Sequence, residues 1–292
     1  LWASPWLTAW VIVAYFVAAF LLEALFTRDS FCLYVCPLGS FNFLYSTVSP
    51  TQIMSRSADV CRDCAGKECI NGRYDEDGVL VQQGCQLELF VPAMRGNMNC
   101  TLCLDCAKAC PYDNVALAVR PPGDELFRQT WPRRLDLALL AILAAFAAWM
   151  NAFAMTPPVY ELEQRLAQAL HTDQEFVVLG LIFLVAAVLG PVALAFLAAA
   201  VNRWTVRGNR PASLRSFVTR YAYLFVPLGF GIWSAHYLFH LLIGPLTVIP
   251  AVQGFFADVL GLPIFGQADW RLAAAWMPSA SAVRWVQMAA MA

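Results

Sequence analysis

Charged residues are scarce in this chain of 292 residues: only 13% are Asp, Glu, Lys or Arg, whereas 60% are hydrophobic. An ordinary soluble domain carries about 25% charged residues, so this composition excludes that class and indicates a membrane protein. The formal net charge of -1 gives no indication of a nucleic-acid partner, and none is predicted. The chain also lacks a nucleophile paired with a base, a phosphate-binding loop and a nucleotide fingerprint, so no catalytic residue is predicted.

Four apolar runs have the length that crosses a bilayer, about 20 residues. They cover residues 6–26, 135–155, 176–201 and 221–246. A fifth apolar stretch, 282–292, is too short to cross. Because Leu1 is not an initiator Met and both ends lie in apolar sequence, we expect a piece of a longer protein with a severed last helix. The sequence therefore predicts an all-α integral membrane protein with four to five transmembrane helices.

The loop charges predict the orientation of these helices. Segment 201–220 carries five arginines and no acid (Arg203, Arg207, Arg210, Arg215 and Arg220), which places it in the cytoplasm by the positive-inside rule. The charged residues of segment 156–175 are mostly acidic, so this segment is expected on the external side. Alternation then places the insert 27–134 in the cytoplasm, with Arg28, Arg133 and Arg134 at its borders. We expect a first helix at 1–26, this cytoplasmic insert, and a membrane domain at 135–292, all in the cytoplasmic (inner) membrane.

All ten cysteines lie in the insert. Structural disulfides do not persist in a reducing cytoplasm, so metal ligation is the better interpretation. Cys100-x2-Cys103-x2-Cys106-x3-Cys110-Pro111 has the spacing with which bacterial ferredoxins hold 4Fe-4S clusters. The alternative is structural zinc, which more often uses two separated pairs of ligands.

The fourth cysteine of such a run normally serves a neighbouring cluster, so a second cluster is expected. Upstream cysteines are available to complete it. We assign one cluster to Cys61, Cys64, Cys69 and Cys110, and the other to Cys85, Cys100, Cys103 and Cys106. The gap of four residues between Cys64 and Cys69 departs from the usual two, so a zinc or 3Fe-4S site in the upstream half stays an alternative. The sequence thus predicts a two-cluster, ferredoxin-like insert.

Two further cysteines, Cys32 and Cys36, stand just after the first span and are followed by Pro37. At positions i and i+4 they would share one face of a helical turn. As cofactor-binding residues they would form half a metal site, a redox-active dithiol, or a step between membrane and insert. The alternative is a pair of buried apolar thiols at a helix end.

His236 and His240 lie on the fourth predicted span. Ionisable groups inside lipid are costly and often functional, so they are candidates for binding a quinone or a haem. Four residues apart, they share a helix face and could not clamp one haem iron from opposite sides. The alternative is a neutral histidine hydrogen-bonded to a neighbouring helix.

Taken in order, "FCLYVCPLGSF", "CRDC" and "CTLCLDCAKACPYDNVAL" resemble the membrane-bound polyferredoxins, the NapH/NosR-like ferredoxin-type quinol dehydrogenases. The resemblance covers about residues 6–134. It implies electron transfer between the quinone pool and a redox partner, another subunit or a soluble carrier, through two 4Fe-4S clusters. It also implies a role for the Cys-x3-Cys-Pro element, which those families commonly have twice and this chain shows once.

Three functional classes follow. The first is an electron-transfer protein, such as a subunit of a quinol dehydrogenase. The second is a copper reductase or assembly factor, since some related polyferredoxins handle copper and soft thiolates suit Cu(I). The third is a membrane anchor in which the clusters only brace the fold. The sequence decides neither the direction of electron flow nor whether the chain is itself an enzyme.

The orientation can be tested with a topology reporter. A reporter fused near Gly123 should be active only on the cytoplasmic side, because the arginine-rich loop fixes the insert there. Activity only on the external side would overturn the positive-inside argument.

Overall fold

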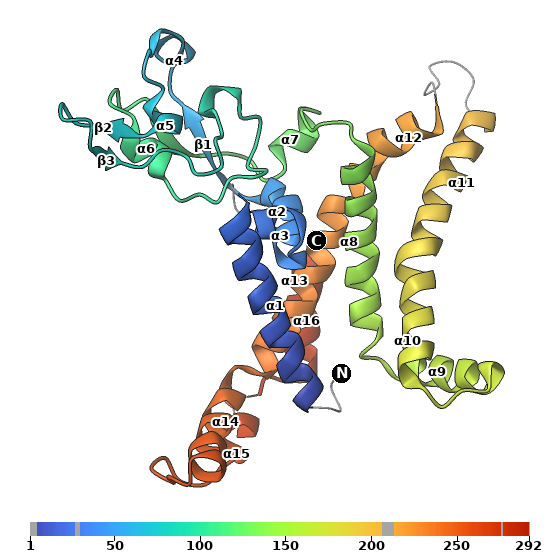
Figure 1. Cartoon of the computed structure of the whole chain (residues 1–292). Helices are drawn as coiled ribbons and strands as arrows, with labels where there is room; N and C mark the ends of the chain where they lie inside the picture. Colours follow the sequence, from blue (N-terminus) through green and yellow to red (C-terminus); the bar gives the residue numbers. More distant parts are fainter. Residues whose placement is uncertain (1–4, 27–29, 206–212, 276, 292) are drawn as a thin grey trace. The chain divides into compact units, whose positions relative to one another are not determined.

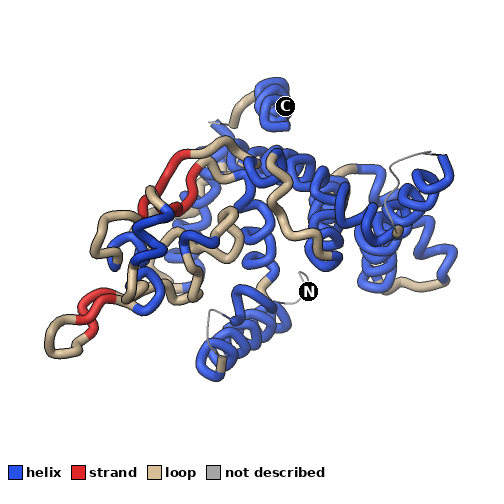
Figure 2. The backbone as a smooth tube through the Cα atoms, turned by 90° about the horizontal axis from the view of Figure 1, so that it is seen from above, coloured by secondary structure: helices blue, strands red, loops and turns tan. Residues whose placement is uncertain are grey.

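The computed structural model describes residues 5–26, 30–205, 213–275 and 277–291 (Figure 1). Arg28, Arg207 and Arg210 lie outside the described residues. Contacts divide the chain into two units, Leu1–Pro132 and Arg133–Ala292, which are described separately below. Most of the chain is helical, and the strands form two short pairs, drawn in red in Figure 2.

The first unit contains small elements after one long helix. They are α1 (Pro5–Leu25), α2 (Ser30–Tyr34), α3 (Pro37–Tyr45), η1 (Ser46–Val48), β1 (Thr51–Ser55), α4 (Ala58–Asp63), α5 (Glu68–Asn71), β2 (Arg73–Tyr74), β3 (Leu80–Gln82), η2 (Val91–Ala93), α6 (Asp105–Ala109), β4 (Val115–Val119) and α7 (Asp124–Phe127).

The second unit is built from helices. They are α8 (Leu135–Phe153), α9 (Pro157–Leu170), α10 (Glu175–Phe183), η3 (Leu184–Leu189), α11 (Gly190–Thr205), α12 (Leu214–Tyr221), η4 (Ala222–Leu224), α13 (Phe225–Ile243), η5 (Pro245–Thr247), α14 (Val248–Gly254), η6 (Phe255–Val259), α15 (Arg271–Ala275) and α16 (Ala280–Met291). Helix α8 packs against both α13 and α11, and α16 packs against α13.

Four helical segments are long and apolar enough to cross a membrane, as predicted: Trp6–Leu25, Leu135–Phe153, Glu175–Thr205 and Leu214–Ile243. The last two are longer than their apolar runs, because polar helical turns such as α12, with Arg215 and Arg220, continue them. The fifth apolar stretch forms α16, of 12 residues. These segments support a multi-pass membrane protein; its orientation stays a prediction.

The pairing of β1 with β4 closes the cysteine-rich part of the first unit. The strands are antiparallel, with Thr51 opposite Val119 and Ser55 opposite Val115. The ladder continues at one end, where Arg56 N–H donates to the carbonyl oxygen of Asn114 at 2.8 Å. The chain between the strands therefore begins and ends at the same place, and eight cysteines lie within it.

A buried ion pair fastens this closure. Arg120 follows β4, and its Nη1 lies 2.6 Å from Oε1 of Glu125 in α7; the two side chains are 4% and 2% exposed. The same guanidinium donates hydrogen bonds to the carbonyl oxygens of Ser46, Thr47 and Ser49. These bonds satisfy the buried charge, as burial requires, and tie β4 to the chain just before β1.

Glu125 also supports the loop that leads to Cys100. The Asn97 backbone N–H donates to Glu125 Oε1 at 3.3 Å, and its side-chain amide donates to the Thr51 carbonyl oxygen at 2.6 Å. A Cβ at Gly96 would lie 2.0 Å from Glu125 Oε1, so only glycine fits there. The ion pair thus orders both strands and the approach to the downstream cysteines.

Removing the cation should destabilise the first unit strongly. Arg120→Met leaves the Glu125 carboxylate buried without its partner, a change that typically costs about 3–5 kcal/mol. Arg128→Met is a matched control, because Arg128 pairs with Asp124 at a surface position where its side chain is 71% exposed, and such pairs contribute about 0–1 kcal/mol. A denaturant melt in which both variants unfold like the unmodified protein would contradict this role for Arg120.

Candidate metal centres

Four cysteines from both halves of the insert surround one cavity, called cavity 1. They are Cys61, Cys64, Cys69 and Cys110. Cys61 lies in α4, Cys69 in α5, and Cys110 directly after α6. The structure therefore brings Cys110 to the upstream cysteines, although it ends the downstream run in sequence.

A turn at Lys67 accommodates the wider spacing between Cys64 and Cys69. Lys67 adopts a left-handed conformation (φ 47°), and α5 begins at the next residue. This backbone region is uncommon for residues other than glycine and persists where the surroundings impose it. The extra residues therefore allow the chain to turn back, so that Cys69 lines the same cavity as Cys61 and Cys64.

The other four cysteines surround a second cavity, called cavity 2. They are Cys85, Cys100, Cys103 and Cys106. Between the last three, Leu102 and Leu104 have φ angles of 56° and 68°. Successive backbone N–H groups in such alternating conformations form concave anion sites, which are frequent around iron-sulfur clusters.

Cys85 reaches cavity 2 through a close backbone crossing. A Cβ at Gly84 would lie 2.1 Å from the carbonyl oxygen of Ile70, so the crossing requires glycine. Next to it, the Cys85 N–H donates to the carbonyl oxygen of Cys69 at 2.9 Å. One hydrogen bond thus links a cysteine of cavity 2 directly to a cysteine of cavity 1.

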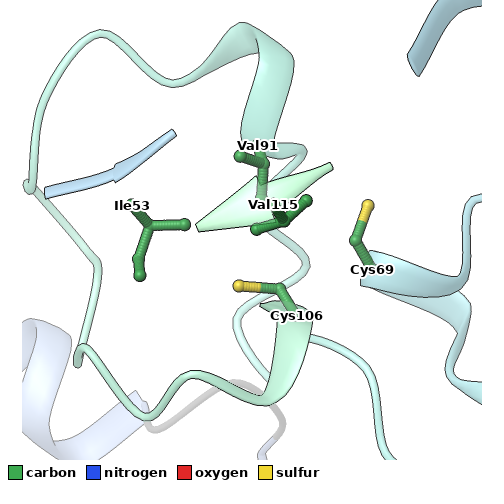
Figure 3. Close-up of a cluster of buried hydrophobic side chains, with 5 residues drawn as sticks. All are labelled: Ile53, Cys69, Val91, Cys106 and Val115. Atoms are coloured by element: carbon green, nitrogen blue, oxygen red, sulfur yellow. The ribbon is translucent and has the colours of Figure 1, made fainter. Parts of the chain in front are cut away.

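A shared apolar core separates the two cavities. Cys69 and Cys106 are buried in it together with Ile53, Val91 and Val115. Figure 3 shows the sulfur atoms of Cys69 and Cys106 pointing in different directions, and that of Cys106 points toward Ile53. Val115 lines cavity 1, whereas Ile53 and Val91 line cavity 2. The core therefore gives each set of thiols an apolar wall.

The electrostatics follow the same two sets. Burial, followed by the nearby thiols of Cys61, Cys64 and Cys110, raises the pKa of Cys69. In cavity 2, burial, followed by Cys85, Cys100 and Cys103, raises the pKa of Cys106 to about 12. Four ionised thiols cannot stay together in such a place without a positive group to bind them.

The donor set fits an iron-sulfur cluster in each cavity. Each cavity has four thiols, the number that a 4Fe-4S cluster requires, and metal binding would compensate their charge when they lose their protons. Among the described residues, no group of three or more His, Cys, Asp or Glu side chains is placed to hold a metal ion. Ligation of iron stays a prediction.

Asn114 and Leu89 supply hydrogen bonds to sulfur that the spacing did not reveal. Asn114 Nδ2 donates to Cys61 Sγ at 3.1 Å, and its backbone N–H donates to Cys110 Sγ at 3.4 Å. In cavity 2, the Leu89 N–H donates to Cys85 Sγ at 3.4 Å. Hydrogen bonds to ligand sulfurs tune the potential of a cluster.

The expectation that Cys32 and Cys36 share a helical turn is wrong. Helix α2 ends at Tyr34, and Cys36 has an extended backbone (φ −72°, ψ 120°) as the N-cap of α3. The reason is Pro37, because a residue before proline is disfavoured in the helical region. Cys32 is exposed and Cys36 is buried, so the two thiols occupy different environments.

Cys36 instead contacts the first span. The Tyr15 hydroxyl donates to Cys36 Sγ at 2.9 Å, and the Gly39 N–H donates to it at 3.4 Å. The bond from Tyr15 is the main cause that lowers the pKa of Cys36. A role for Cys32 and Cys36 in binding a cofactor stays a prediction.

His236 and His240 lie in the second unit, on α13. Their Nε2 atoms are 3.2 Å apart, and His236 Nε2 is 3.1 Å from Nδ2 of Asn151 on α8. His236 is buried and has a polar partner on a neighbouring helix, as the structural alternative requires. Binding of a quinone or haem by this pair stays a prediction.

Comparison with known proteins finds one partial similarity. Over 97 residues the chain is 30% identical to the protein named "Putative electron transport protein YccM" of Escherichia coli (strain K12). The match covers 32% of this chain and 23% of the relative, so it spans less than a quarter of that protein. No family model matches the chain, and no solved structure matches it.

The contact between Tyr15 and Cys36 can be tested by thiol reactivity. Tyr15→Phe removes the donor, which should raise the pKa of Cys36 and slow its alkylation at neutral pH about fivefold, the equivalent of one hydrogen bond. The rate against pH, read by mass spectrometry on the Cys36 peptide, should move to higher pH. Tyr34→Phe is the control, since Tyr34 is 82% exposed. Equal rates in both variants would exclude the contact.

Proposed function

We propose that this chain is a membrane-bound iron-sulfur protein that passes electrons between the quinone pool and a redox partner through two 4Fe-4S clusters. The observation that carries the proposal is the position of Cys110, which lines cavity 1 with Cys61, Cys64 and Cys69. This exchange between motifs is what the Cys-x3-Cys-Pro ending predicts for a protein with two clusters.

The chain itself would hold, insulate and tune the clusters. A 4Fe-4S cluster, when bound, supplies a centre that changes its charge by one electron. Ile53, Val91 and Val115 form apolar walls beside the buried thiols of Cys69 and Cys106, and apolar surroundings affect the potential of a cluster. Asn114 and Leu89 donate hydrogen bonds to sulfur, which stabilise the more negative, reduced state.

A short path connects the two cavities. The Cys85 N–H bonds to the Cys69 carbonyl oxygen, so a ligand of one cavity touches the backbone of a ligand of the other. At the surface, Cys103 is exposed in cavity 2 and Tyr112, which lines cavity 1, is 57% exposed. Electrons could then enter near one cavity and leave near the other, toward a partner subunit or a soluble carrier.

A copper reductase or assembly factor is the second candidate. Its support is Cys36, whose thiolate is stabilised by the Tyr15 hydroxyl, because soft thiolates suit Cu(I). In that case the purified protein would contain stoichiometric copper, and the Cys36→Ser variant would lose this copper.

Metal analysis and reduction by quinol test the proposal together. The purified chain should be brown, contain about eight irons, and develop electron paramagnetic resonance (EPR) signals when a quinol analogue or dithionite is added. Stoichiometric zinc with little iron would overturn the iron-sulfur assignment, and stoichiometric copper that is lost in Cys36→Ser would favour the second candidate. If dithionite reduces the iron but no quinol does, the quinone pool is not the electron donor that we propose.

A further inference from the structure

An open groove lies beside cavity 2 in the first unit. It has a volume of about 340 Å³ and is lined by residues from three segments, 88–90, 93–99 and 130–132. Pockets for small organic molecules commonly measure about 300–1,000 Å³. The groove, called the Trp131 groove below, is therefore large enough for a ring-sized ligand.

Two residues form a wall that the groove shares with cavity 2. Leu89 and Met94 line both of them. Leu89 also donates its N–H to Cys85 Sγ at 3.4 Å. A molecule in the groove would therefore be separated from cavity 2 by a single layer of side chains, formed by two residues. Among the described residues that line the groove, Phe90 alone also lines cavity 1.

The lining suits a flat ring with polar edges. Trp131 is 6% exposed, and Phe90, Met94 and Met98 are partly buried; aromatic rings and thioethers pack well against flat apolar faces. Arg95 and Glu88 add one charge of each sign to the same groove. A guanidinium only donates hydrogen bonds and a carboxylate accepts them, so a ring with a carbonyl and a hydroxyl oxygen finds both partners.

The groove is also close in sequence to a candidate membrane span. Its third segment ends at Pro132, and the spanning helix α8 begins three residues later, at Leu135. This closeness along the sequence is compatible with a ligand that dissolves in lipid.

We propose that the Trp131 groove binds the ring of a quinol and that electrons enter the protein through cavity 2; this inference rests on the proposed function. Oxidation breaks both O–H bonds of the quinol. With a cluster held in each cavity, the two electrons would pass singly across the wall of Leu89 and Met94, one for each cluster. Two protons leave to water at the open rim of the groove, and the product is the quinone.

Photolabelling of the full-length chain, purified with its clusters, tests the site without measuring activity. Azido derivatives of a short-chain benzoquinone and a naphthoquinone are cross-linked, and labelled peptides are identified by mass spectrometry. Labels should fall within residues 88–99 and 130–132. Ala93→Trp places a ring in the groove and should abolish labelling, whereas Val79→Trp, on an exposed turn outside the groove, should not.

Arg95→Gln provides a second variant in case Ala93→Trp does not fold. It should weaken quinone binding about tenfold, as expected for the loss of one charged hydrogen bond, and leave the EPR spectrum of the dithionite-reduced protein unchanged. Labels on α13 around His236, or no label on the groove segments, would overturn this site while leaving the two clusters in place. A chain that labels in the groove but carries no iron would instead contradict the proposed function.

Discussion

The antiparallel pairing of β1 with β4 is the constraint on which both cysteine cavities depend. It brings the start and the end of the cysteine-rich chain together, with Ser55 opposite Val115. Because Cys61 follows one strand and Cys110 precedes the other, the pairing sets them on the same cavity. The buried contact of Arg120 with Glu125 supports the pairing, although neither residue lines a cysteine cavity.

Glycines and left-handed residues complete the arrangement where the chain must pass closely. Gly84 lets the backbone cross Ile70 and deliver Cys85 to cavity 2. Lys67 and Leu102 turn the chain between successive cysteines. Lys67 and Leu102 adopt backbone conformations that are uncommon for residues other than glycine, whereas Gly84 passes where a side chain would not fit. Together they surround two spaces with thiols whose charges only a bound positive group can compensate.

The length of an apolar run, a local rule, predicted the four long spans. The position of a cysteine before proline predicted two sets of four thiols, and these sets line separate cavities; their role as cluster ligands stays a prediction. The contacts of Tyr15 with Cys36 and of Asn114 with Cys61 could not be predicted, since they join residues that only the folded chain brings together. The helical turn expected for Cys32 and Cys36 failed for a local reason that the sequence did contain, the restriction that Pro37 places on its predecessor. The Trp131 groove gave no sequence signal, because three separate segments form it.

In the proposed arrangement, each cluster takes its ligands from both cysteine motifs. The most direct test is to replace single cysteines by Ala and record which EPR signal of the reduced protein changes. Cys110→Ala and Cys61→Ala should alter the same signal, and Cys103→Ala and Cys85→Ala should alter the other. If Cys110→Ala instead changes the signal that Cys103→Ala changes, the clusters are ligated within each motif and the two-cavity account is contradicted.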